Sequence, residues 1–397
     1  MITLEEAQAT ILGVTNYLHA RPMPVADAVG HVILDALLSP IDLPPFDNSS
    51  MDGYAVRAAD LAKAGASAPV TLRIASKLPA GTGAAQPVEP GTCARIFTGS
   101  MLPPGADAVV MQEEVKVESA AAVFAEPAAP HENVRFKGED LKAGTPVTCL
   151  PVVLTPQRAA LLAAVGIASI RATPKPVVGL IATGSELREP GQPLGPGQIY
   201  ESNRTMLAAL ASQFQAHPKI YPLLPDDLSA TKAALATAFA ECDAVVTTGG
   251  VSVGEMDFVK AAFTELGGQI DFWKVAIRPG KPFVFGRLNN KLLFGLPGNP
   301  VSAFVTFLLL VAPALLKMRG FSDPILPVKT ATLAEPFVNK TDRRHFARAL
   351  VDYKNQARLS GPQASHRLLS LADCNGLIDV PPRTTLSAGA TVTALTW

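Results

Sequence analysis

The chain has 397 residues, 48% of them hydrophobic, and its 34 basic residues balance its 34 acidic residues. This length indicates two to four domains. A broad nucleic-acid-binding surface is excluded because it would need a basic excess, so any anion site must be local.

The cysteines and the apolar segments favour a cytoplasmic protein outside the membrane. The four cysteines (Cys93, Cys149, Cys242 and Cys374) are far apart and form no CxxC pair, which argues against a zinc cluster or disulfide framework. The first residues carry acids where a signal peptide needs bases. The longest apolar run, Val301–Leu316, contains Pro313 and is shorter than the roughly 20 residues of a membrane span. We expect it to form a buried helix.

The first half of the chain combines helical and β patterns. Apolar residues at helical spacing predict helices over Leu4–Leu18 and Val25–Leu38. From about 41 to 150, short apolar runs between Gly and Pro turns predict a β-rich region. A helix then follows, with Thr155 as its N-cap and Gly166 as its C-terminal stop.

From residue 175, apolar strands alternate with amphipathic helices. This alternation predicts βαβ units and a doubly wound, largely parallel sheet, interrupted by a hairpin at "DFWKVAIRPGKPFVFGRL". Beyond about residue 323, prolines and short strands predict a small C-terminal β domain.

Three glycine turns follow three of the predicted strands, at 182–187, 247–257 and 295–302. They should converge, because the carboxyl ends of parallel strands share one edge of a sheet. Glycine allows close backbone approach, and the helix that begins at Pro300, with Asn299 as its expected cap, would attract a phosphate-like anion. Each turn could be an ordinary connection, but three on one edge favour an anion site. None matches GxxxxGK[ST] or GxGxxG, which disfavours a P-loop ATPase or a Rossmann dehydrogenase.

Five acids lie just past strand ends: Glu186, Asp226, Asp227, Glu255 and Asp257. One or two of them could simply balance helix dipoles or cap helices. Five beside an anion site would repel one another, by about 4 kcal/mol for two charges 4 Å apart at a surface-like dielectric. Mg²⁺ removes this conflict, since one or two carboxylates plus substrate phosphates commonly hold it.

Positive charge is available in the hairpin, where Lys274, Arg278 and Lys281 follow one another closely. They could serve the anion site or form a solvated surface. The six histidines match no metal-binding or nucleophile-activating pattern. The chemistry should therefore depend on metal binding and electrostatic positioning.

The motifs "PPFDNSSMDGYAV", "ARIFTGSMLPPGADAVVMQEE", "TGSEL", "TTGGVSVGEMD", "RPGKP" and "GLPGNPVSA" occur in this order along the chain. In this the chain resembles the MoeA-type molybdopterin molybdenumtransferases, to which the gephyrin E domain is related. The resemblance implies insertion of molybdate into adenylated molybdopterin, with Mg²⁺ as cofactor and release of AMP.

The resemblance also implies site residues, motif by motif. It places catalytic residues at Asp52, Thr98, Glu186, Asp226 and Asp257, with Glu186 and Asp257 as metal ligands. It implies substrate-binding roles for Arg135, Asp140, Gly249, Gly250, Ser252, Gly254, Lys274, Arg278, Lys281, Asn299, Ser302, Arg343 and Ser370. Arg278 stands where some family members have Lys, which replaces a point charge with a planar fork.

The family fold implies a multi-domain α/β and β protein. An elongated helical/β region would comprise 1–40 and 141–174, a β-rich inserted lobe 41–140, the α/β domain 175–322, and a β-barrel-like domain 323–397. The family forms elongated homodimers, with the active site between the α/β domain of one subunit and the inserted lobe of the other. A molybdopterin adenylyltransferase and molybdoenzyme chaperones are possible partners.

Two other functions stay open at this point. A gephyrin-like scaffold would bind partner peptides without catalysis, but it would not need all of these acids and cations. An adenylyltransferase or nucleotide hydrolase would need only the α/β domain, which the order of all four regions disfavours.

Overall fold

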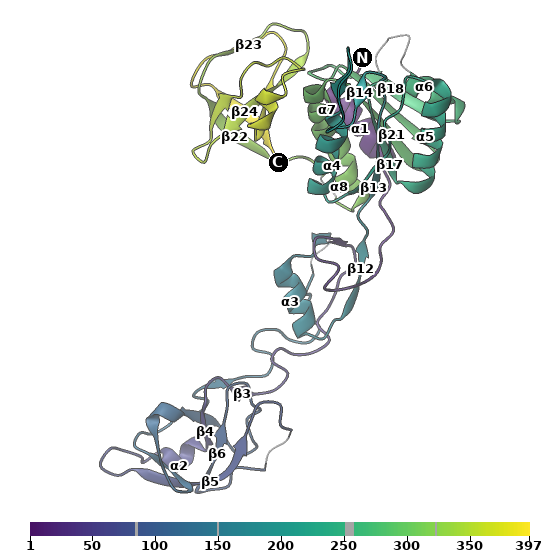
Figure 1. Cartoon of the computed structure of the whole chain (residues 1–397). Coiled ribbons are helices and arrows are strands. Elements are labelled where there is room, and N and C mark those ends of the chain that lie inside the picture. The colour runs from purple at the N-terminus through teal and green to yellow at the C-terminus, as the bar shows by residue number, and fades with distance from the viewer. Residues whose placement is uncertain (84–85, 149–150, 251–257, 322–323) are drawn as a thin grey trace. The chain divides into compact units, whose positions relative to one another are not determined.

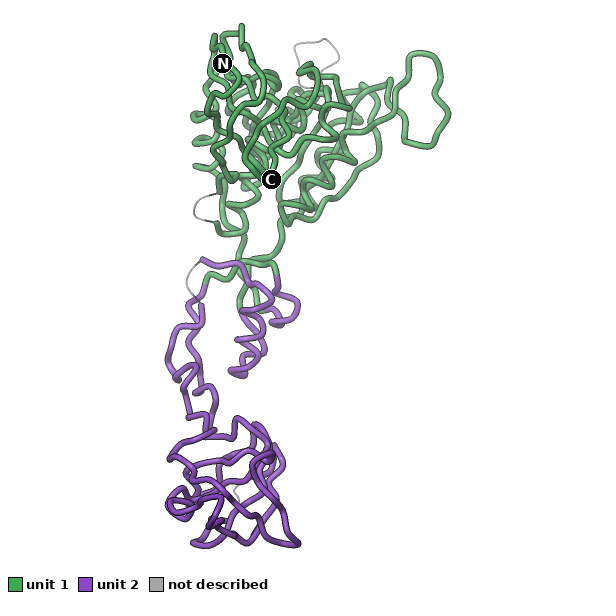
Figure 2. The backbone as a smooth tube through the Cα atoms, turned by 90° about the vertical axis from the view of Figure 1, so that its left-hand side faces the viewer, with its two compact units in different colours: residues 1–22, 30–34, 171–397 green, residues 23–29, 35–170 purple. Residues whose placement is uncertain are grey.

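The computed structural model describes residues 1–83, 86–148, 151–250, 258–321 and 324–397. They divide into two compact units (Figure 2). One unit contains residues 1–22, 30–34 and 171–397, and the other contains residues 23–29 and 35–170.

A six-stranded sheet forms the centre of the first unit. Its spatial order is β16 (His217–Ile220), β13 (Val177–Ala182), β17 (Ala244–Thr248), β21 (Lys291–Leu296), β20 (Pro282–Leu288) and β18 (Gln269–Lys274). The first four strands are parallel, while β21, β20 and β18 pair antiparallel. The prediction of a largely parallel sheet interrupted by a hairpin is therefore confirmed.

Helices cover both faces of this sheet (Figure 1). On one face α5 (Leu228–Glu241) and α6 (Phe258–Glu265) share a core with alternate strand residues such as Val245 and Leu293. The opposite face packs against α1 (Leu4–Val14), α4 (Asn203–Gln213) and α7 (Pro300–Thr306). The α/β domain is therefore doubly wound, as its sequence predicts.

Helix α7 continues through a π-helical segment (Phe307–Val311) into α8 (Ala312–Met318). This continuous helix is the single candidate among the described residues that is long and apolar enough to cross a membrane. A core helix of a soluble protein has the same length and composition, and 89% of its most apolar window is buried inside this protein. The prediction of a buried helix is confirmed.

The C-terminal strands close into a five-stranded barrel. It consists of β22 (Val328–Leu333), β24 (Arg344–Val351), β25 (Gln356–Leu359), β26 (Gly376–Val380) and β28 (Thr391–Thr396). Strand β24 pairs with both β25 and β26, which closes the ring. The short strand β19 (Ile277–Arg278) leaves the α/β hairpin and pairs parallel with β24. Three small elements complete this part: β23 (Phe337–Asn339), β27 (Thr384–Leu386) and α9 (Leu369–Ala372).

The predicted helix over Val25–Leu38 is wrong. Strand β1 (Arg21–Pro24) is followed by turns and by β2 (Val32–Ile33), which pairs antiparallel with β12 (Ser169–Thr173). Gly30 adopts a φ of +83°, which interrupts a helix, and β-branched Val and Ile favour a strand. The predicted helix over Leu4–Leu18 forms as α1 and begins with a capping box at Thr3.

The second unit is built on a six-stranded sheet. Its order is β7 (Ala108–Met111), β4 (Gly53–Val56), β6 (Thr92–Ile96), β5 (Val70–Leu78), β9 (Ala121–Phe124) and β8 (Val115–Glu118). Its short elements are α2 (Ala58–Leu61), a 3-10 turn (Gln112–Glu114), β3 (Asn48–Ser49), β10 (Val134–Arg135) and β11 (Val152–Val153). Helix α3 (Pro156–Ala164) has the predicted cap, because the Thr155 hydroxyl accepts a hydrogen bond from the Arg158 amide. The four predicted domain boundaries stay predictions.

Candidate active site

Two neighbouring cavities lie in the first unit at the carboxyl ends of the parallel strands. The smaller cavity, of about 360 Å³, lies between the hairpin loop 278–282, the start of α7 and the loop 363–366. The larger cavity, of about 600 Å³, is lined by residues that follow β13, β17 and β21. Both include Asn299 and His366 in their walls. The predicted convergence of the three glycine turns is confirmed for the part of them that is described.

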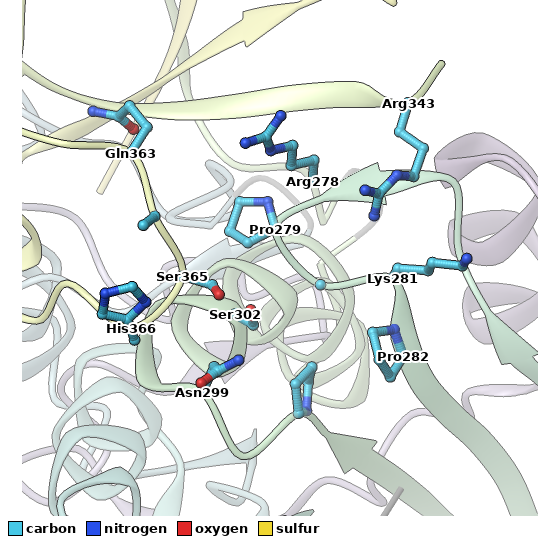
Figure 3. Close-up of a pocket in the computed structure, with 13 residues that line it drawn as sticks. Arg278, Pro279, Lys281, Pro282, Asn299, Ser302, Arg343, Gln363, Ser365 and His366 are labelled. Atoms are coloured by element: carbon cyan, nitrogen blue, oxygen red, sulfur yellow. The ribbon is translucent and has the colours of Figure 1, made fainter. Parts of the chain in front are cut away.

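The smaller cavity has a cationic wall (Figure 3). Arg278, Lys281 and Arg343 line it, and no Asp or Glu does so within the described part of the chain. Ser302, which is only 4% exposed, adds a hydroxyl from the first turn of α7. The amide groups of a helix N-terminus also favour negative charge. The arrangement suits a small anion.

Backbone contacts fix the loops around this smaller cavity. Strand β19 holds Arg278 in register with His345 of β24. The Val301 amide at the start of α7 donates to the Ser365 carbonyl oxygen at 3.3 Å. The Gln363 side chain accepts from the Arg348 amide at 2.8 Å and donates to the Arg348 carbonyl oxygen at 3.1 Å. The barrel and the α/β domain therefore shape the cavity together.

The larger cavity has an acidic side chain at its rim. Glu186 folds back over Gly184, where a Cβ atom would lie 2.7 Å from Oε2. The φ of +155° at Gly184 favours glycine at this position. The other acid in the wall, Glu201, pairs with Arg204 at 3.0 Å. Glu186 makes no ion pair within the described residues.

Asn203 joins the turns beneath the larger cavity. Its Nδ2 donates to Thr248 Oγ1 and to the Gly298 carbonyl oxygen, both at 2.7 Å. The amide therefore links the end of β17 to the turn that precedes α7. Gly249 and Gly250 adopt positive φ values of 83° and 63° and lie against Thr183. Side chains at these positions would clash with Thr183.

Asp226 and Asp227 have different structural roles. Asp226 Oδ2 accepts from the Ser185 amide at 3.0 Å, and the Asp226 amide donates to Ser185 Oγ at 3.2 Å. Asp227 caps α5 by accepting from the Ala230 amide at 2.7 Å. Asp226 therefore holds the turn that carries Glu186, but it does not line either cavity.

Two predicted binding residues lie outside both cavity walls, and a third, Asn299, lines both but lacks the expected side-chain cap. Lys274 lies outside both cavity walls and stacks over the Trp273 ring at 3.7 Å. Ser370 is also absent from both walls, because its hydroxyl bonds to Arg348 and to the Pro362 and Arg367 carbonyl oxygens. Asn299 stands at the start of α7 without a side-chain capping bond, so its amide is available to both cavities.

Asp52 and Thr98 form a separate pair in the second unit. The Thr98 amide and hydroxyl each donate to Asp52 Oδ1 at 2.8 Å. These bonds, the backbone one first, lower the pKa of the Asp52 carboxyl from its ordinary value. Arg95 donates to the Gly53 carbonyl oxygen and lies over the Phe97 ring at 4.8 Å. The two bonds therefore hold the Asp52 carboxylate in place in its charged form.

Of the remaining predicted site residues, the structure describes two, Arg135 and Asp140. Arg135, in β10, and Asp140 are exposed on the second unit. Ser252, Gly254 and Asp257, together with the unassigned Glu255, lie outside the described residues. Within the described chain, no group of three or more His, Cys, Asp or Glu side chains could hold a metal ion.

Three family models match the chain in order. The MoeA N-terminal region (domain I and II) matches residues 2–166, the probable molybdopterin binding domain residues 179–317, and the MoeA C-terminal region (domain IV) residues 330–397. The molybdopterin molybdenumtransferase of Haemophilus influenzae is 39% identical over 99% of this chain and 98% of its own. The chain belongs to the molybdopterin molybdenumtransferase family.

Other members of the molybdopterin molybdenumtransferase family are similar to this chain over at least 96% of its length. Molybdopterin molybdenumtransferase 2 of Mycobacterium tuberculosis is 38% identical over 96% of each chain. A molybdopterin biosynthesis MoeA protein from Pyrococcus horikoshii has a solved structure with a TM-score of 0.86, at 32% identity, covering 100% of this chain and 99% of that one. The resemblance found from the sequence motifs is confirmed.

The sequence did not predict three polar residues of the cavity walls in this molybdopterin molybdenumtransferase family member: Gln363, Ser365 and His366. The segment "QASHRLLS" contains two serines, and Ser365 is the one that lines the smaller cavity. The polar cluster Gln-Ala-Ser-His before an apolar run was the signal that could have indicated them. Asn203 was also missed, because its position in the wall depends on three turns that meet only in the fold.

Proposed function

We propose that this chain inserts molybdate into adenylated molybdopterin and releases AMP, with Mg²⁺ as its cofactor. The observation that carries the proposal is the smaller cavity, which has three cations and no described carboxylate in its wall. The larger cavity beside it has two carboxylates, Glu186 and the Arg204-paired Glu201. A small dianion and a larger phosphorylated ligand can thus bind next to each other. Their reacting groups would meet near Asn299 and His366, which belong to both walls.

Molybdate binds in the smaller cavity as the substrate oxyanion. Arg278, Lys281 and Arg343 neutralise its two negative charges, and Arg343 is oriented by its Nη1 bond to the Ile277 carbonyl oxygen at 3.3 Å. Ser302 donates a hydrogen bond from its buried hydroxyl. Because the wall contains three cationic side chains and no described acid, the cavity disfavours cationic ligands.

Adenylated molybdopterin binds in the larger cavity. Gly249 lines this cavity and has no side chain, so a phosphate can approach its backbone there. Asn203 keeps this turn and the turn before α7 at a fixed separation. The two phosphates of the adenylated substrate are therefore placed at the end of the parallel strands.

One carboxylate in the wall of the larger cavity, Glu186, suits a Mg²⁺ ion. The Glu186 carboxylate lies at the rim without an ion-pair partner in the described chain, and Mg²⁺ commonly binds one or two carboxylates plus substrate phosphates. Glu186 and Asp257 would hold the ion. When bound, the ion neutralises charge on the cleaved phosphate group. Asp226 orients the Glu186 turn through its bonds to Ser185.

The proposed reaction balances without a change in molybdenum oxidation state. Water adds across the phosphate–phosphate bond, which breaks and releases AMP. Both dithiolene sulfurs bond to molybdenum, and their two protons leave with one oxo group as water. The chain has to position the oxyanion and the sulfurs and exclude further water, so preorganised electrostatics supplies the rate enhancement.

The protein acts as a cytoplasmic homodimer in this proposal. The pair of Asp52 and Thr98 in the inserted lobe of one subunit completes the site formed by the α/β domain of the other. Arg135 and Asp140 of the same lobe contribute to substrate binding. A molybdopterin adenylyltransferase delivers the substrate, and molybdoenzyme chaperones receive the product.

Two charge-removing variants test the function. Lys281→Ala and Arg343→Ala should raise the KM for molybdate about tenfold or more, because each removes one cation from the oxyanion. The assay measures AMP release and cofactor formation with purified protein, adenylated molybdopterin and Mg²⁺. Lys329→Ala is the matched control, because Lys329 is an exposed barrel lysine outside both cavities. A molybdate KM equal to wild type in both cavity variants would refute the assignment.

A further inference from the structure

Arg95 lies next to the two segments that hold the Asp52 carboxylate. It belongs to β6 and pairs across the sheet with Tyr54 of β4. Asp52 directly precedes β4, and Thr98 lies just beyond the end of β6. The register of the two strands therefore places Arg95 beside both partners of the Asp52–Thr98 pair.

The Arg95 guanidinium bridges two points around the main chain of Asp52. Its Nη1 donates to the carbonyl oxygen of Gly53, the residue after Asp52, at 2.8 Å. Its Nη2 donates to Gln112 Oε1. The Gln112 amide in turn donates to the Asp52 carbonyl oxygen at 3.0 Å. One planar fork thus joins both contacts of the Asp52 main chain, and a lysine ammonium lacks this fork geometry.

Two aromatic rings restrain the Arg95 fork. The guanidinium carbon of Arg95 lies 5.1 Å from the centre of the Tyr54 ring and 4.8 Å from the centre of the Phe97 ring. Cation–π contacts of this kind favour a guanidinium over the ring face. Tyr54 belongs to the segment that follows Asp52, and Phe97 directly precedes Thr98. Arg95 therefore contacts both segments of the pair.

The charge of Arg95 also acts on Asp52. The two oxygens that accept from the fork, on Gly53 and Gln112, belong to neutral groups, so no acid cancels the charge through these bonds. The Thr98 amide and hydroxyl contribute most to the low pKa of the Asp52 carboxyl, and the attraction of Arg95 lowers this pKa further. Arg95 therefore favours the charged form of Asp52 as well as its position.

We propose that Arg95 is a positioning residue for the reaction: its guanidinium fork holds the Asp52 carboxylate in the orientation that completes the active site. The inference rests on the proposed function, which gives Asp52 its part in the reaction. Arg95 acts through Asp52 and does not contact the substrate. A residue that only packs on two rings needs neither a fork nor a charge, so variants that remove these features separately distinguish the two roles.

Two variants separate the fork from the charge. Arg95→Met keeps an unbranched side chain that can pack on the two rings, but it removes both the fork and the charge. Arg95→Lys keeps the charge without the planar fork that joins the two oxygens. Arg73→Met is the matched control, because Arg73 is an exposed arginine of β5 in the same sheet.

The first measurement separates kcat from the KM for molybdate. AMP release is followed with the whole purified chain, adenylated molybdopterin and Mg²⁺. Arg95→Met should lower kcat about tenfold or more because Asp52 loses its orientation, while the KM for molybdate stays within about twofold. Arg95→Lys should remain at least about fivefold below wild type in kcat. Arg73→Met should match wild type in both constants.

The second measurement follows Asp52 without the reaction. The Thr98 amide donates to Asp52 Oδ1, so its resonance shifts as the carboxyl titrates. The chain is labelled with isotopic threonine, and the Thr98 signal is identified by its absence in Thr98→Ser. Because loss of a nearby opposite charge raises a carboxyl pKa, the titration midpoint should rise in Arg95→Met and stay near wild type in Arg95→Lys.

Three results would overturn the proposal. A wild-type kcat in Arg95→Met would show that Asp52 does not depend on Arg95, and a wild-type kcat in Arg95→Lys would show that the fork is dispensable. An unchanged Thr98 titration midpoint in Arg95→Met would show that the carboxylate does not sense Arg95. Wild-type activity of Asp52→Asn would instead remove the lobe from the proposed function, so the two failures are distinguishable.

Discussion

His345 is buried beside the smaller cavity's cations, and neither of its ring nitrogens has a hydrogen-bond partner in the described structure. Its ring packs edge-on against Phe337 at 5.1 Å. Burial, followed by repulsion from Arg278, Arg348 and Arg343, lowers the pKa of His345 to about 4. The imidazole is therefore neutral in the folded protein at pH 7.

This neutral histidine makes the barrel sensitive to acid. The unfolded chain protonates His345 below its ordinary pKa of 6.5, while the folded chain does so only near 4. Stability from this group is thus complete above pH 6.5 and is lost as the pH falls toward 4, by at most about 3 kcal/mol. His345→Phe should reduce the loss in urea unfolding midpoint between pH 7.5 and pH 5.

The exposed histidine His217 supplies the control, and His217→Gln should keep the wild-type pH dependence. If His345→Phe and wild type lose stability equally between the two pH values, burial of a neutral imidazole is not the cause of the acid sensitivity.

Residue-level prediction from sequence succeeded where a motif fixed the register. Arg278 and Lys281 flank the turn "RPGKP", and Ser302 follows "PGNP" at a fixed offset. All three line the smaller cavity, and their roles in substrate binding stay predictions. Ser365 and Ser370 occur five residues apart in one segment, and spacing alone did not separate the cavity residue from the buried one. His366 has no histidine or cysteine at metal-ligand spacing, so only the polar cluster around it could have indicated its place in the cavity wall.

At the scale of elements, the two adjacent acids before α5 have different roles: Asp227 stabilises the helix, and Asp226 holds the turn that carries Glu186. Asp227 supplies the N-cap of α5, and replacement of such a cap by Ala costs about 1 kcal/mol. Asp227→Ala should therefore lower the urea midpoint while activity stays within about twofold. Asp226→Ala should release the Ser185 turn and reduce turnover at least tenfold, because Glu186 loses its position.

Both variants are measured by urea unfolding and by the rate of AMP release at saturating Mg²⁺. The opposite pattern, with Asp227→Ala inactive and Asp226→Ala only destabilised, would show that the functional acid has been assigned to the wrong residue.

The sequence predicts elements well where periodicity and end signals agree. Helix α3 has its threonine cap and the Gly166 stop, and the α/β domain alternates as its apolar runs indicate. Val25–Leu38 was predicted wrongly because Val25, Ala28 and Val32 satisfy helical spacing, whereas the pairing of β2 depends on β12, far along the chain. The barrel closure between β24 and β26 also depends on long-range pairing that no local pattern shows.

At the scale of the whole molecule, the proposed dimer predicts complementation. Asp52→Ala should inactivate the lobe side of the site, and Lys281→Ala should leave the oxyanion cavity mostly empty at molybdate concentrations below the wild-type KM. A mixed dimer of the two variants has one site with both residues intact, so it should recover up to about half of the wild-type activity per dimer.

Differently tagged protomers are refolded together, and mixed dimers are isolated by tandem affinity purification before AMP release is measured. Mixed dimers with no more activity than either parent would place both residues in a site within a single subunit.

The core on one face of the α/β sheet contains residues from near both ends of the chain. Leu4 and Ile11 of α1 pack in the same cluster as Phe304, Leu371 and Leu377. During synthesis, strands β13, β17 and β21 leave the ribosome long before Leu377 does. The α/β domain therefore cannot complete its hydrophobic core as an early-folding module, and the barrel sequence is part of its folding information.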